Sequence, residues 1–403
     1  MNELRARQGR RVVVAANFTA ESIVSAMEAL SRRWSLGFEV NSAPYNQLFR
    51  QLMDPKSAIA VNDSAANVFF VRIEDLVESR SMMPLELLKQ LSKLAQNADD
   101  LVGAFGNASA FQVGNFVFVC PLSAGSATVP ELRVGLTAVR DEFIERLTGQ
   151  PNLFVFDCDG TASRFGLEVV DDDARNRLGH VPFSEEYNTA LAVDALRRVD
   201  SLVRKPFKVL VLDCDNTLWD GIVGEQGVGG ISLSEGRRFL QSFAVDLSAR
   251  GVVVCLNSRN NKEDVWEVFD QRKDMILRRE NIVASRINWL PKSENLRSLA
   301  AELELGLDSF VFVDDDPAVC AEVRSNCPEV LTVHLPESSI DLPRLFEHLW
   351  VFDRLKVTDE DRNRTRSYQD QAKRRELKRS STGVADYLRS LDLRCEIEEI
   401  RVE

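Results

Sequence analysis

The chain has 403 residues, of which 44% are hydrophobic and 28% are charged, with 20 glycines and 13 prolines. This composition excludes a disordered, collagen-like or membrane-spanning chain, and the length predicts about two to three domains. The 62 acidic residues outnumber the 50 basic ones, which leaves a formal net charge of -12. Such a charge repels nucleic acid and anionic lipid, so we expect neither nucleic acid nor a membrane as a partner.

The cysteines and the N-terminal sequence indicate a reducing compartment. The seven cysteines are odd in number and form no CxxC pair, which favours reduced thiols over a disulfide framework or a zinc site. The first residues lack the apolar core of a signal peptide. We therefore expect a cytoplasmic protein, and with only three histidines we expect carboxylates to carry most of the chemistry.

Residues 1–165 are predicted to form an α/β domain. Short β-branched or aromatic runs alternate there with amphipathic stretches, the runs being 11–16, 68–73 and 116–120 and the stretches lying near 23–30, 85–94 and 132–147. This alternation predicts a mostly parallel sheet covered by helices on both faces. Residues 166–206 are expected to be a connector that contains a helix over 185–204.

Residues 207–350 are predicted to form a second α/β domain. The apolar runs KVLVLD (208–213), GVVVCLNS (251–258) and SFVFVDDD (309–316) are typical of buried parallel strands, and helices are expected at 234–248 and 292–305. The remaining segment, 351–403, is charged, and we expect a helical extension that can lead into a further domain.

The strand ends of the second domain carry a predicted metal site. Ligands bind at the carboxyl ends of strands in open parallel sheets, and Asp213 and Asp215 lie two residues apart at one such end. Asp314 and Asp315 end another of these strands. Carboxylate oxygens are ligands that Mg²⁺ prefers, so we predict a Mg²⁺ site formed by Asp213, Asp215, Asp314 and Asp315.

The same strand ends predict phosphoryl transfer. Asp213 can attack phosphorus while Asp215 transfers the proton of the leaving group, and Thr217 follows in the turn. Donors to phosphate oxygens are expected from Ser258, Arg259, Asn260 and Lys292. The alternative is that these groups only cap helices and turns.

These elements resemble the haloacid dehalogenase (HAD) superfamily of phosphoryl-transfer enzymes, with 221–230 as a flap and no large cap. The longer text DCDNTLWDGIVGEQG, NSRNNKEDVWEVF, RINWLPKSENL and FVFVDDDPAVCAEV is similar to the FkbH-like family, subclass IIIC, of polyketide and hybrid nonribosomal peptide loading systems. The resemblance extends to AANFTAESI near the N-terminus and to DRNRTRSYQ near the C-terminus. It implies an SGNH-hydrolase-like, Rossmann-like three-layer domain over 1–165 and a HAD-like Rossmannoid domain with a minimal cap over 207–350.

The resemblance also implies a function. Family members take a glyceryl unit from 1,3-bisphosphoglycerate, hold it as an enzyme thioester, remove phosphate and load the unit onto the phosphopantetheine thiol of an acyl carrier protein. Cys214, between the two motif aspartates, is the candidate for the thioester and thus for the catalytic set, although it can equally be a buried packing residue. The alternatives are a simple Mg²⁺-dependent HAD phosphatase and a non-catalytic carrier-protein docking module.

The chain departs from the family pattern at four positions. Asp220, Arg259, Asp316 and Val319 stand where family members usually carry Gly, Lys, Asn and Glu. Asp316 is expected to add a negative charge beside the metal. The core motif residues remain, so we expect an active enzyme.

The N-terminal domain lacks the Gly-Asp-Ser nucleophile block of SGNH hydrolases. AANFT (15–19) stands in its place, Thr19 is not favoured as a nucleophile, and Asp173 and His180 do not have the usual DxxH spacing. We predict a scaffold or docking domain. The basic residues Lys373, Arg374, Arg375, Lys378 and Arg379 could attract an acidic carrier protein, but a solvated helix face is the preferred interpretation.

An internal echo of the motif occurs in LFVFDCDGTA (153–162), which contains Asp157, Cys158, Asp159 and Thr161. It is followed by no serine, lysine and acidic pair at comparable spacing. We interpret it as the last strand and turn of the first domain and not as a second active site.

Overall fold

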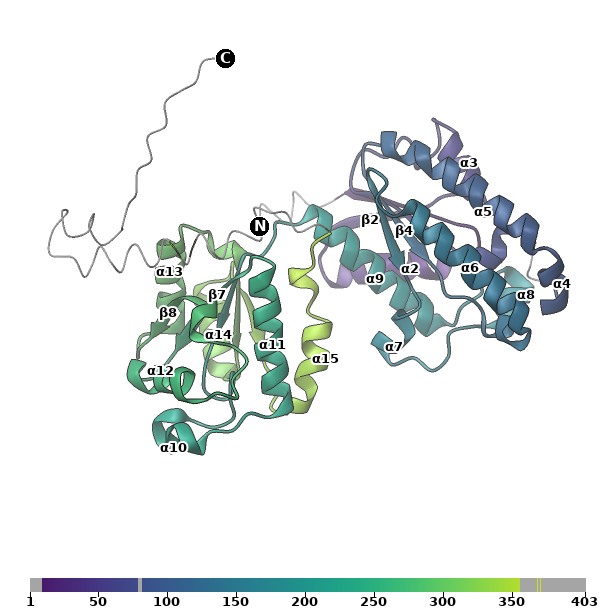
Figure 1. Cartoon of the computed structure of the whole chain (residues 1–403). Helices are drawn as coiled ribbons and strands as arrows, with labels where there is room; N and C mark the ends of the chain where they lie inside the picture. Colours follow the sequence, from purple (N-terminus) through teal and green to yellow (C-terminus); the bar gives the residue numbers. More distant parts are fainter. Residues whose placement is uncertain (1–8, 79–81, 356–367, 369, 371–403) are drawn as a thin grey trace, which may run out of the picture. The chain divides into compact units, whose positions relative to one another are not determined.

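The computed structural model describes residues 9–78, 82–355, 368 and 370, and the chain divides into two units, Met1–Arg204 and Lys205–Glu403. Each unit contains a five-stranded sheet in which every strand pair is parallel, with helices packed against it (Figure 1). The predicted two-domain, Rossmann-like α/β fold is therefore confirmed. Among the described residues, no helix is both long and apolar enough to cross a membrane.

The sheet of the first unit has the strand order β2-β1-β3-β4-β5. Its strands are β1 (Arg10–Ala16), β2 (Phe38–Ser42), β3 (Ala66–Val71), β4 (Gly114–Val119) and β5 (Leu153–Asp157). The central strands β3 and β4 are buried along their whole length, as expected for apolar runs covered on both faces.

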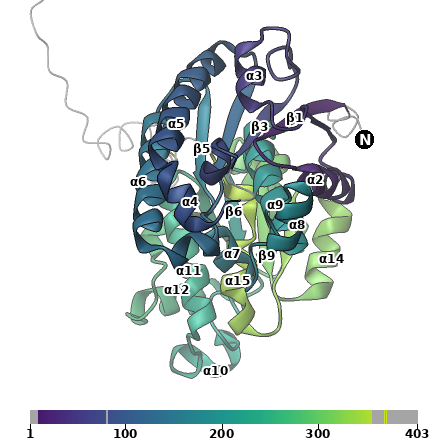
Figure 2. The same ribbon diagram turned by 90° about the vertical axis from the view of Figure 1, so that its right-hand side faces the viewer.

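Helices cover both faces of this sheet (Figure 2). α5 (Leu91–Phe105) and α6 (Pro130–Leu147) pack together on one face, with α3 (Leu48–Met53) and α4 (Pro84–Lys89) beside them. α2 (Glu21–Arg33) and α9 (Glu185–Val203) pack together on the other. The shorter helices α7 (Thr161–Phe165) and α8 (Asp173–Gly179) lie between β5 and α9 in the sequence.

Residues 166–204 are not a separate connector, contrary to our expectation. They contain α8 and α9, and α9 contacts both α2 and β4 of the first unit. Leu191, Leu196 and Val199 of α9 are fully buried. The helix was predicted, but its apolar face belongs to the core of the first unit, so the first unit extends to Arg204.

The sheet of the second unit has the order β10-β9-β6-β7-β8. Its strands are β6 (Val209–Leu212), β7 (Val253–Ser258), β8 (Ile282–Ile287), β9 (Phe310–Asp314) and β10 (Leu331–His334). β6 is central, and β6, β7 and β9 are buried throughout. The motif that follows β6 therefore starts at the middle of the carboxyl edge of the sheet.

Two apolar layers enclose this second sheet. One contains residues of α11 (Glu235–Ala249), α12 (Lys262–Gln271) and α15 (Leu342–Glu347), and the other contains residues of α13 (Lys292–Leu303) and α14 (Pro317–Asn326). The flap after β6 carries α10 (Val223–Gly230). Of the predicted extension 351–403, only residues 351–355, 368 and 370 are described, so its helix and the basic residues from Lys373 to Arg379 lie outside the described part.

Candidate active site

Four of the predicted residues meet at the carboxyl edge of the second sheet. Asp213 directly follows β6, Ser258 ends β7, Asp314 ends β9, and Lys292 is the first residue of α13. All four are buried, with relative exposures between 1% and 8%. Buried polar groups of this kind need partners, and each finds one within this group or in its neighbours.

Lys292 connects the ends of these strands. Its Nζ donates to Asp213 Oδ1 at 2.5 Å, to Asp314 Oδ2 at 3.1 Å and to the carbonyl oxygen of Asn257 at 2.5 Å. Burial acts to lower the pKa of Lys292, but the charges of Asp213 and Asp314 outweigh burial and raise it. The ammonium therefore stays charged and fixes the two carboxylates in place.

Three carboxylates form a group that can hold a cation. Oxygens of Asp213, Asp314 and Asp315 all lie within 4.8 Å of one another. Burial, followed by the charge of Asp213, raises the pKa of Asp314 to about 6 and also raises the pKa of Asp315. Mutual repulsion of this kind is relieved by a divalent cation, and hard oxygen ligands of this number fit Mg²⁺.

Asp215 does not belong to this group, although we predicted it as a fourth ligand. Its Oδ1 accepts hydrogen bonds from Trp219 Nε1 at 2.8 Å and from the backbone nitrogen of Val223 at 3.0 Å. Its Oδ2 accepts from Asn260 Nδ2 at 2.8 Å. Both oxygens thus point to the flap and to the loop after β7, and neither belongs to the three-carboxylate group.

The predicted phosphate-binding residues divide into two classes. Asn260 is buried and donates to Ser258 Oγ at 3.3 Å. Thr217, which was predicted in the catalytic set, is also buried and donates to Asp315 Oδ1 at 3.2 Å. Arg259 is exposed to solvent and takes no part in these contacts. Ser258, Asn260 and Thr217 therefore belong to the buried site, whereas Arg259 lies at its rim.

Cys214 faces the apolar side of the sheet, although its thiol stays within hydrogen-bonding reach of the Ser258 hydroxyl. The side chain is fully buried and belongs to the apolar cluster that contains Leu210, Leu212 and Trp219. Successive residues of an extended strand point to opposite faces, so Cys214 continues the side of Leu210 and Leu212. Burial, followed by the charge of Asp213, raises its pKa well above the usual value. This environment favours the packing interpretation and disfavours a thiolate nucleophile.

Asp220, one of the unusual residues, anchors the base of the flap. Its Oδ1 lies 3.0 Å from Nε of the buried Arg237, and its Oδ2 accepts a hydrogen bond from the backbone nitrogen of Ser234 at 3.0 Å. Gly221 follows with a φ of 104°, a conformation that favours glycine. Asp220 therefore joins the flap to the start of α11.

Asp316 serves as a helix cap. Its Oδ1 accepts hydrogen bonds from the backbone nitrogens of Ala318 at 2.7 Å and Val319 at 3.4 Å, at the N-terminus of α14. The carboxylate is thus used at the helix terminus and does not belong to the three-carboxylate group, and the expected effect of its charge on the metal stays a prediction. Val319, a residue of α14, packs in the apolar core of this unit.

Sequence reasoning missed two residues that shape the site. Trp219 binds Asp215 through its indole, and Arg237 binds Asp220 and lies 3.4 Å from the carbonyl oxygen of Thr217. Trp219 follows Asp215 by four residues and could have been suspected from its proximity. Arg237 lies in a helix with no local signal for this contact.

The two acids of the echo motif in the first unit contact a guanidinium. Arg140 of α6 pairs with Asp157, and its Nη2 lies 3.0 Å from Asp159 Oδ1. Arg140 is 3% exposed, and Cys158 between the two acids is 2% exposed. The echo consists of β5, the last strand of this sheet, and the turn after it, as expected. Thr161 begins α7 and donates to Asp194.

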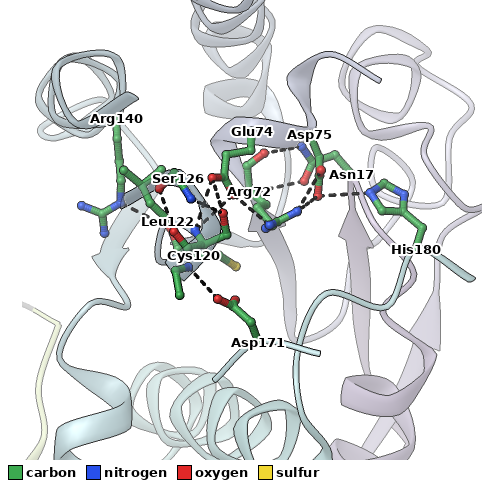
Figure 3. A network of polar contacts seen from close by, with 12 residues as sticks. Asn17, Arg72, Glu74, Asp75, Cys120, Leu122, Ser126, Arg140, Asp171 and His180 are labelled. Atoms are coloured by element: carbon green, nitrogen blue, oxygen red, sulfur yellow. Dashed lines mark hydrogen bonds and ion pairs between the residues drawn. The ribbon is translucent and has the colours of Figure 1, made fainter. Parts of the chain in front are cut away.

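Within the described part of the chain, Thr19 has no catalytic partner. Its hydroxyl donates to the carbonyl oxygen of Gly179 at 2.7 Å. The ring of His180 lies instead 2.7 Å from the Tyr45 hydroxyl. On its other side it lies 3.1 Å from Asp75 Oδ2 (Figure 3). Asp173 is the first residue of α8 and is not part of this arrangement. A serine-hydrolase type of site is therefore not assembled here.

Comparison with known proteins relates this chain to solved structures. No family model matches the chain, and no curated protein matches it. The crystal structure of the N-terminal part of the protein BF1531 from Bacteroides fragilis, described as containing a phosphatase domain complexed with Mg, superimposes with a TM-score of 0.73. The sequences are 23% identical, and the match covers 88% of this chain and 96% of that one.

A second solved structure, the tagatose-6-phosphate ketose/aldose isomerase from Escherichia coli, reaches a TM-score of only 0.21 at 10% identity. This chain thus shares the fold of the N-terminal part of BF1531 over most of its length.

Proposed function

We propose that the second unit is a Mg²⁺-dependent phosphatase that acts on a small phosphorylated compound. The observation that carries this proposal is the contact of one buried ammonium, that of Lys292, with Asp213 and Asp314 beside a third carboxylate, Asp315. The solved structure with the same fold contains a phosphatase domain and Mg, which supports both the reaction and the cation.

Asp213 is the nucleophile in this proposal. A carboxylate oxygen of Asp213 forms a bond to phosphorus while the bond from phosphorus to the leaving oxygen breaks. Lys292 orients Asp213 through its Oδ1. Lys292 and the Ser258 hydroxyl supply positive charge and a hydrogen bond to the phosphoryl oxygens. Asp213, Asp314 and Asp315 would hold Mg²⁺, which when bound would supply positive charge against the negative phosphoryl group.

Asp215 moves the protons. It donates a proton to the leaving oxygen in the first step and takes a proton from water in the second, when water attacks the phosphorus of the aspartyl phosphate and releases phosphate. Its three hydrogen bonds, from Trp219, Val223 and Asn260, hold the carboxylate in one orientation. Because Val223 begins the flap helix, this orientation also depends on the flap.

The experiment is phosphate release from p-nitrophenyl phosphate and from phosphoglycerates, with Mg²⁺ or with EDTA. Asp213→Asn should lower turnover by a factor of about a thousand or more, since the covalent step is lost. Asp157→Asn is the matched control, because Asp157 opens the same DCD motif in the first unit but pairs with Arg140. Equal activity of the parent and Asp213→Asn would refute the proposal.

A more specific form of the proposal is glyceryl transfer from 1,3-bisphosphoglycerate to an acyl carrier protein. Its support is the sequence resemblance to the FkbH-like family. The buried position and raised pKa of Cys214 count against this residue as the acyl carrier. Intact-protein mass spectrometry with Mg²⁺ and 1,3-bisphosphoglycerate tests the step directly, with Cys214→Ala run alongside.

The outcomes of that experiment separate the hypotheses. A thiol-labile adduct that disappears in Cys214→Ala would establish acyl transfer through Cys214 despite its burial. Phosphate release without an adduct would restrict the function to a phosphatase. Neither an adduct nor phosphate release would leave the non-catalytic docking module as the better account.

A further inference from the structure

The first unit contains a cavity at the carboxyl edge of its sheet, lined by residues of α4, α6 and α8. Arg72, which directly follows β3, and Ser123, which lies shortly after β4, also line it. The cavity has a volume of about 240 Å³. Sites for drug-sized ligands have about 300–1,000 Å³, so this cavity suits a smaller compound. The proposed phosphatase function uses none of these residues.

The buried charges of the lining are paired before any ligand binds. The Arg72 guanidinium lies 2.8 Å from Glu74 Oε2 and donates to both oxygens of Asp75, at 3.0 and 2.9 Å (Figure 3). The Ser123 hydroxyl donates to Glu74 Oε1 at 2.7 Å. Arg72, Glu74 and Asp75 are all buried. This part of the lining is therefore a rigid structure that ligand binding does not have to organise.

Two buried polar atoms of the lining residues have no hydrogen-bond partner within the part of the chain that the structure describes. One is Nε of Arg72, a donor, and the other is Oδ1 of Asn176 on α8, an acceptor. Arg72 as a whole is only 5% exposed, so bulk water does not replace the missing partner. An unmade hydrogen bond at a buried group is costly, and such groups in a native structure call for a bound molecule.

The charges around the cavity balance one another. Its lining carries two cations, Arg72 and Arg177, and two acids, Glu74 and Asp173. Arg177 and Asp173 are exposed residues of α8, one turn apart. An anionic ligand would approach the buried Glu74, and a cationic ligand would approach the buried Arg72. An uncharged ligand avoids both costs, so the lining favours a neutral compound.

The opposite wall of the cavity is apolar. Leu87 of α4 and Leu132 of α6 are buried there, and Met83, just before α4, is 68% exposed. A ligand that extends along these side chains removes apolar surface from water, which stabilises the complex. The cavity thus combines one unpaired donor and one unpaired acceptor with an aliphatic wall.

We propose that this cavity binds a small uncharged aliphatic amide. The amide oxygen accepts from Arg72 Nε, the amide N–H donates to Asn176 Oδ1, and the aliphatic part packs against Leu87 and Leu132. An amide carries its acceptor and its donor on separate atoms, so it can serve two residues from different elements at once. A carboxylate has no donor for Asn176, and an ammonium has no acceptor for Arg72.

Ligand-observed NMR titration of the full chain with hexanamide, hexanoate and hexylamine tests this proposal. The three probes have six carbons each but end in an amide, a carboxylate and an ammonium group. Hexanamide should bind with a dissociation constant at least about tenfold below those of the other two, because each charged probe leaves one lining atom without a partner. Propanamide should bind more weakly than hexanamide, since its shorter chain covers less of the apolar wall.

A methylated amide and a variant locate the N–H contact. N,N-dimethylhexanamide has no N–H and should bind at least about tenfold more weakly than hexanamide. Asn176→Leu should weaken hexanamide by a similar factor but leave N,N-dimethylhexanamide nearly unchanged, because that compound never makes this hydrogen bond. Gln96→Leu is the matched control, since it replaces an exposed amide of α5 outside the lining and should change neither probe. Circular dichroism checks the fold of both variants.

Three results would overturn the proposal. The first is no saturable binding of hexanamide, which would mean that only ordered water fills the cavity. The second is binding of hexanoate or hexylamine as tight as that of hexanamide, a comparison that needs only the parent chain. The third is hexanamide binding that a folded Asn176→Leu does not weaken. The proposal rests on the first unit alone and is independent of the phosphatase function, so the two fail separately.

Discussion

The Lys292 ammonium lies 2.5 Å from Asp213 Oδ1, and the two side chains are only 2% and 12% exposed. The same ammonium contacts Asp314. One buried cation therefore holds two of the three carboxylates of the proposed metal site, and the site depends on it before any metal binds.

Lys292→Met should leave Asp213 and Asp314 buried without their counter-charge. Removing one member of a buried ion pair costs about 3–5 kcal/mol, so we expect a loss of this order in the free energy of unfolding without Mg²⁺. Mg²⁺ should restore part of the loss, because it binds the same carboxylates in the folded chain. Urea unfolding with and without Mg²⁺ measures both effects. Lys262→Met, at an exposed lysine of the same unit, is the control, and an equally small effect of both variants would contradict this role.

Asp316 offers a test of the departures from the family pattern. Because its carboxylate caps α14, Asp316→Asn should leave stability and phosphatase activity nearly unchanged, since Asn is an equally good cap. Asp316→Ala should lower the free energy of unfolding by about 1 kcal/mol. Thermal unfolding and Mg²⁺ titration of both variants check this. A large gain in Mg²⁺ affinity with Asp316→Asn would show that the charge acts on the metal after all.

The sequence predicted the strands well because burial on both faces requires unbroken apolar runs. KVLVLD and SFVFVDDD are such runs, and both are central strands. The error at 166–206 has a different cause. The amphipathic pattern of α9 identifies a helix and a buried face, but it does not say which sheet that face covers, and α9 returns to α2 and β4 of the first unit.

The sequence predicts which residues of the site lie together where they end neighbouring strands. It does not predict the orientation of a side chain that has several possible hydrogen-bond partners. Asp213, Ser258 and Asp314 lie together because parallel strands end at one edge. The orientation of Asp215 depends on Trp219 and Asn260, and that of Asp316 depends on two backbone nitrogens. Spacing alone places all these carboxylates near the edge and cannot distinguish a ligand from a proton donor or a helix cap.

Asp215 and Asp315 should separate in their effects on the metal. Asp315 belongs to the three-carboxylate group and Asp215 does not, so Asp315→Asn should weaken Mg²⁺ binding at least about tenfold while Asp215→Asn leaves it nearly unchanged. Asp215→Asn should still lower turnover by about 10²- to 10⁴-fold, because proton transfer is lost. Calorimetric Mg²⁺ titration and turnover assays on both variants give the comparison, and equal loss of affinity would return Asp215 to the metal site.

The buried thiols should be inert in the folded chain. Six described cysteines are buried, and burial raises the pKa of Cys120, Cys158 and Cys214. Because the thiolate is the reactive form, iodoacetamide at neutral pH should modify these six negligibly in the native chain and fully after unfolding. Peptide mapping by mass spectrometry reports each site. Rapid modification of Cys214 by iodoacetamide in the native chain would instead support Cys214 as the acyl carrier.

The echo motif gives a prediction about acid stability. Arg140 lowers the pKa of Asp157 despite partial burial of the carboxylate, which acts to raise it. A lowered folded-state pKa contributes stability that is present above the unfolded pKa of about 3.9 and lost as pH falls through the folded value.

Arg140→Met should therefore reduce the free energy of unfolding of the first unit by about 1 kcal/mol at neutral pH, a small value because water screens the half-exposed Asp157. The difference between variant and parent should shrink as the pH falls below about 4, since protonation of Asp157 and Asp159 removes the attraction to Arg140. Asp159 acts in the same sense in this comparison, because Arg140 favours its ionised form even though burial raises its pKa. Urea unfolding of parent and variant across this pH range measures the difference. A gap that stays constant with pH would mean that Arg140 stabilises the unit by packing and not by its charge.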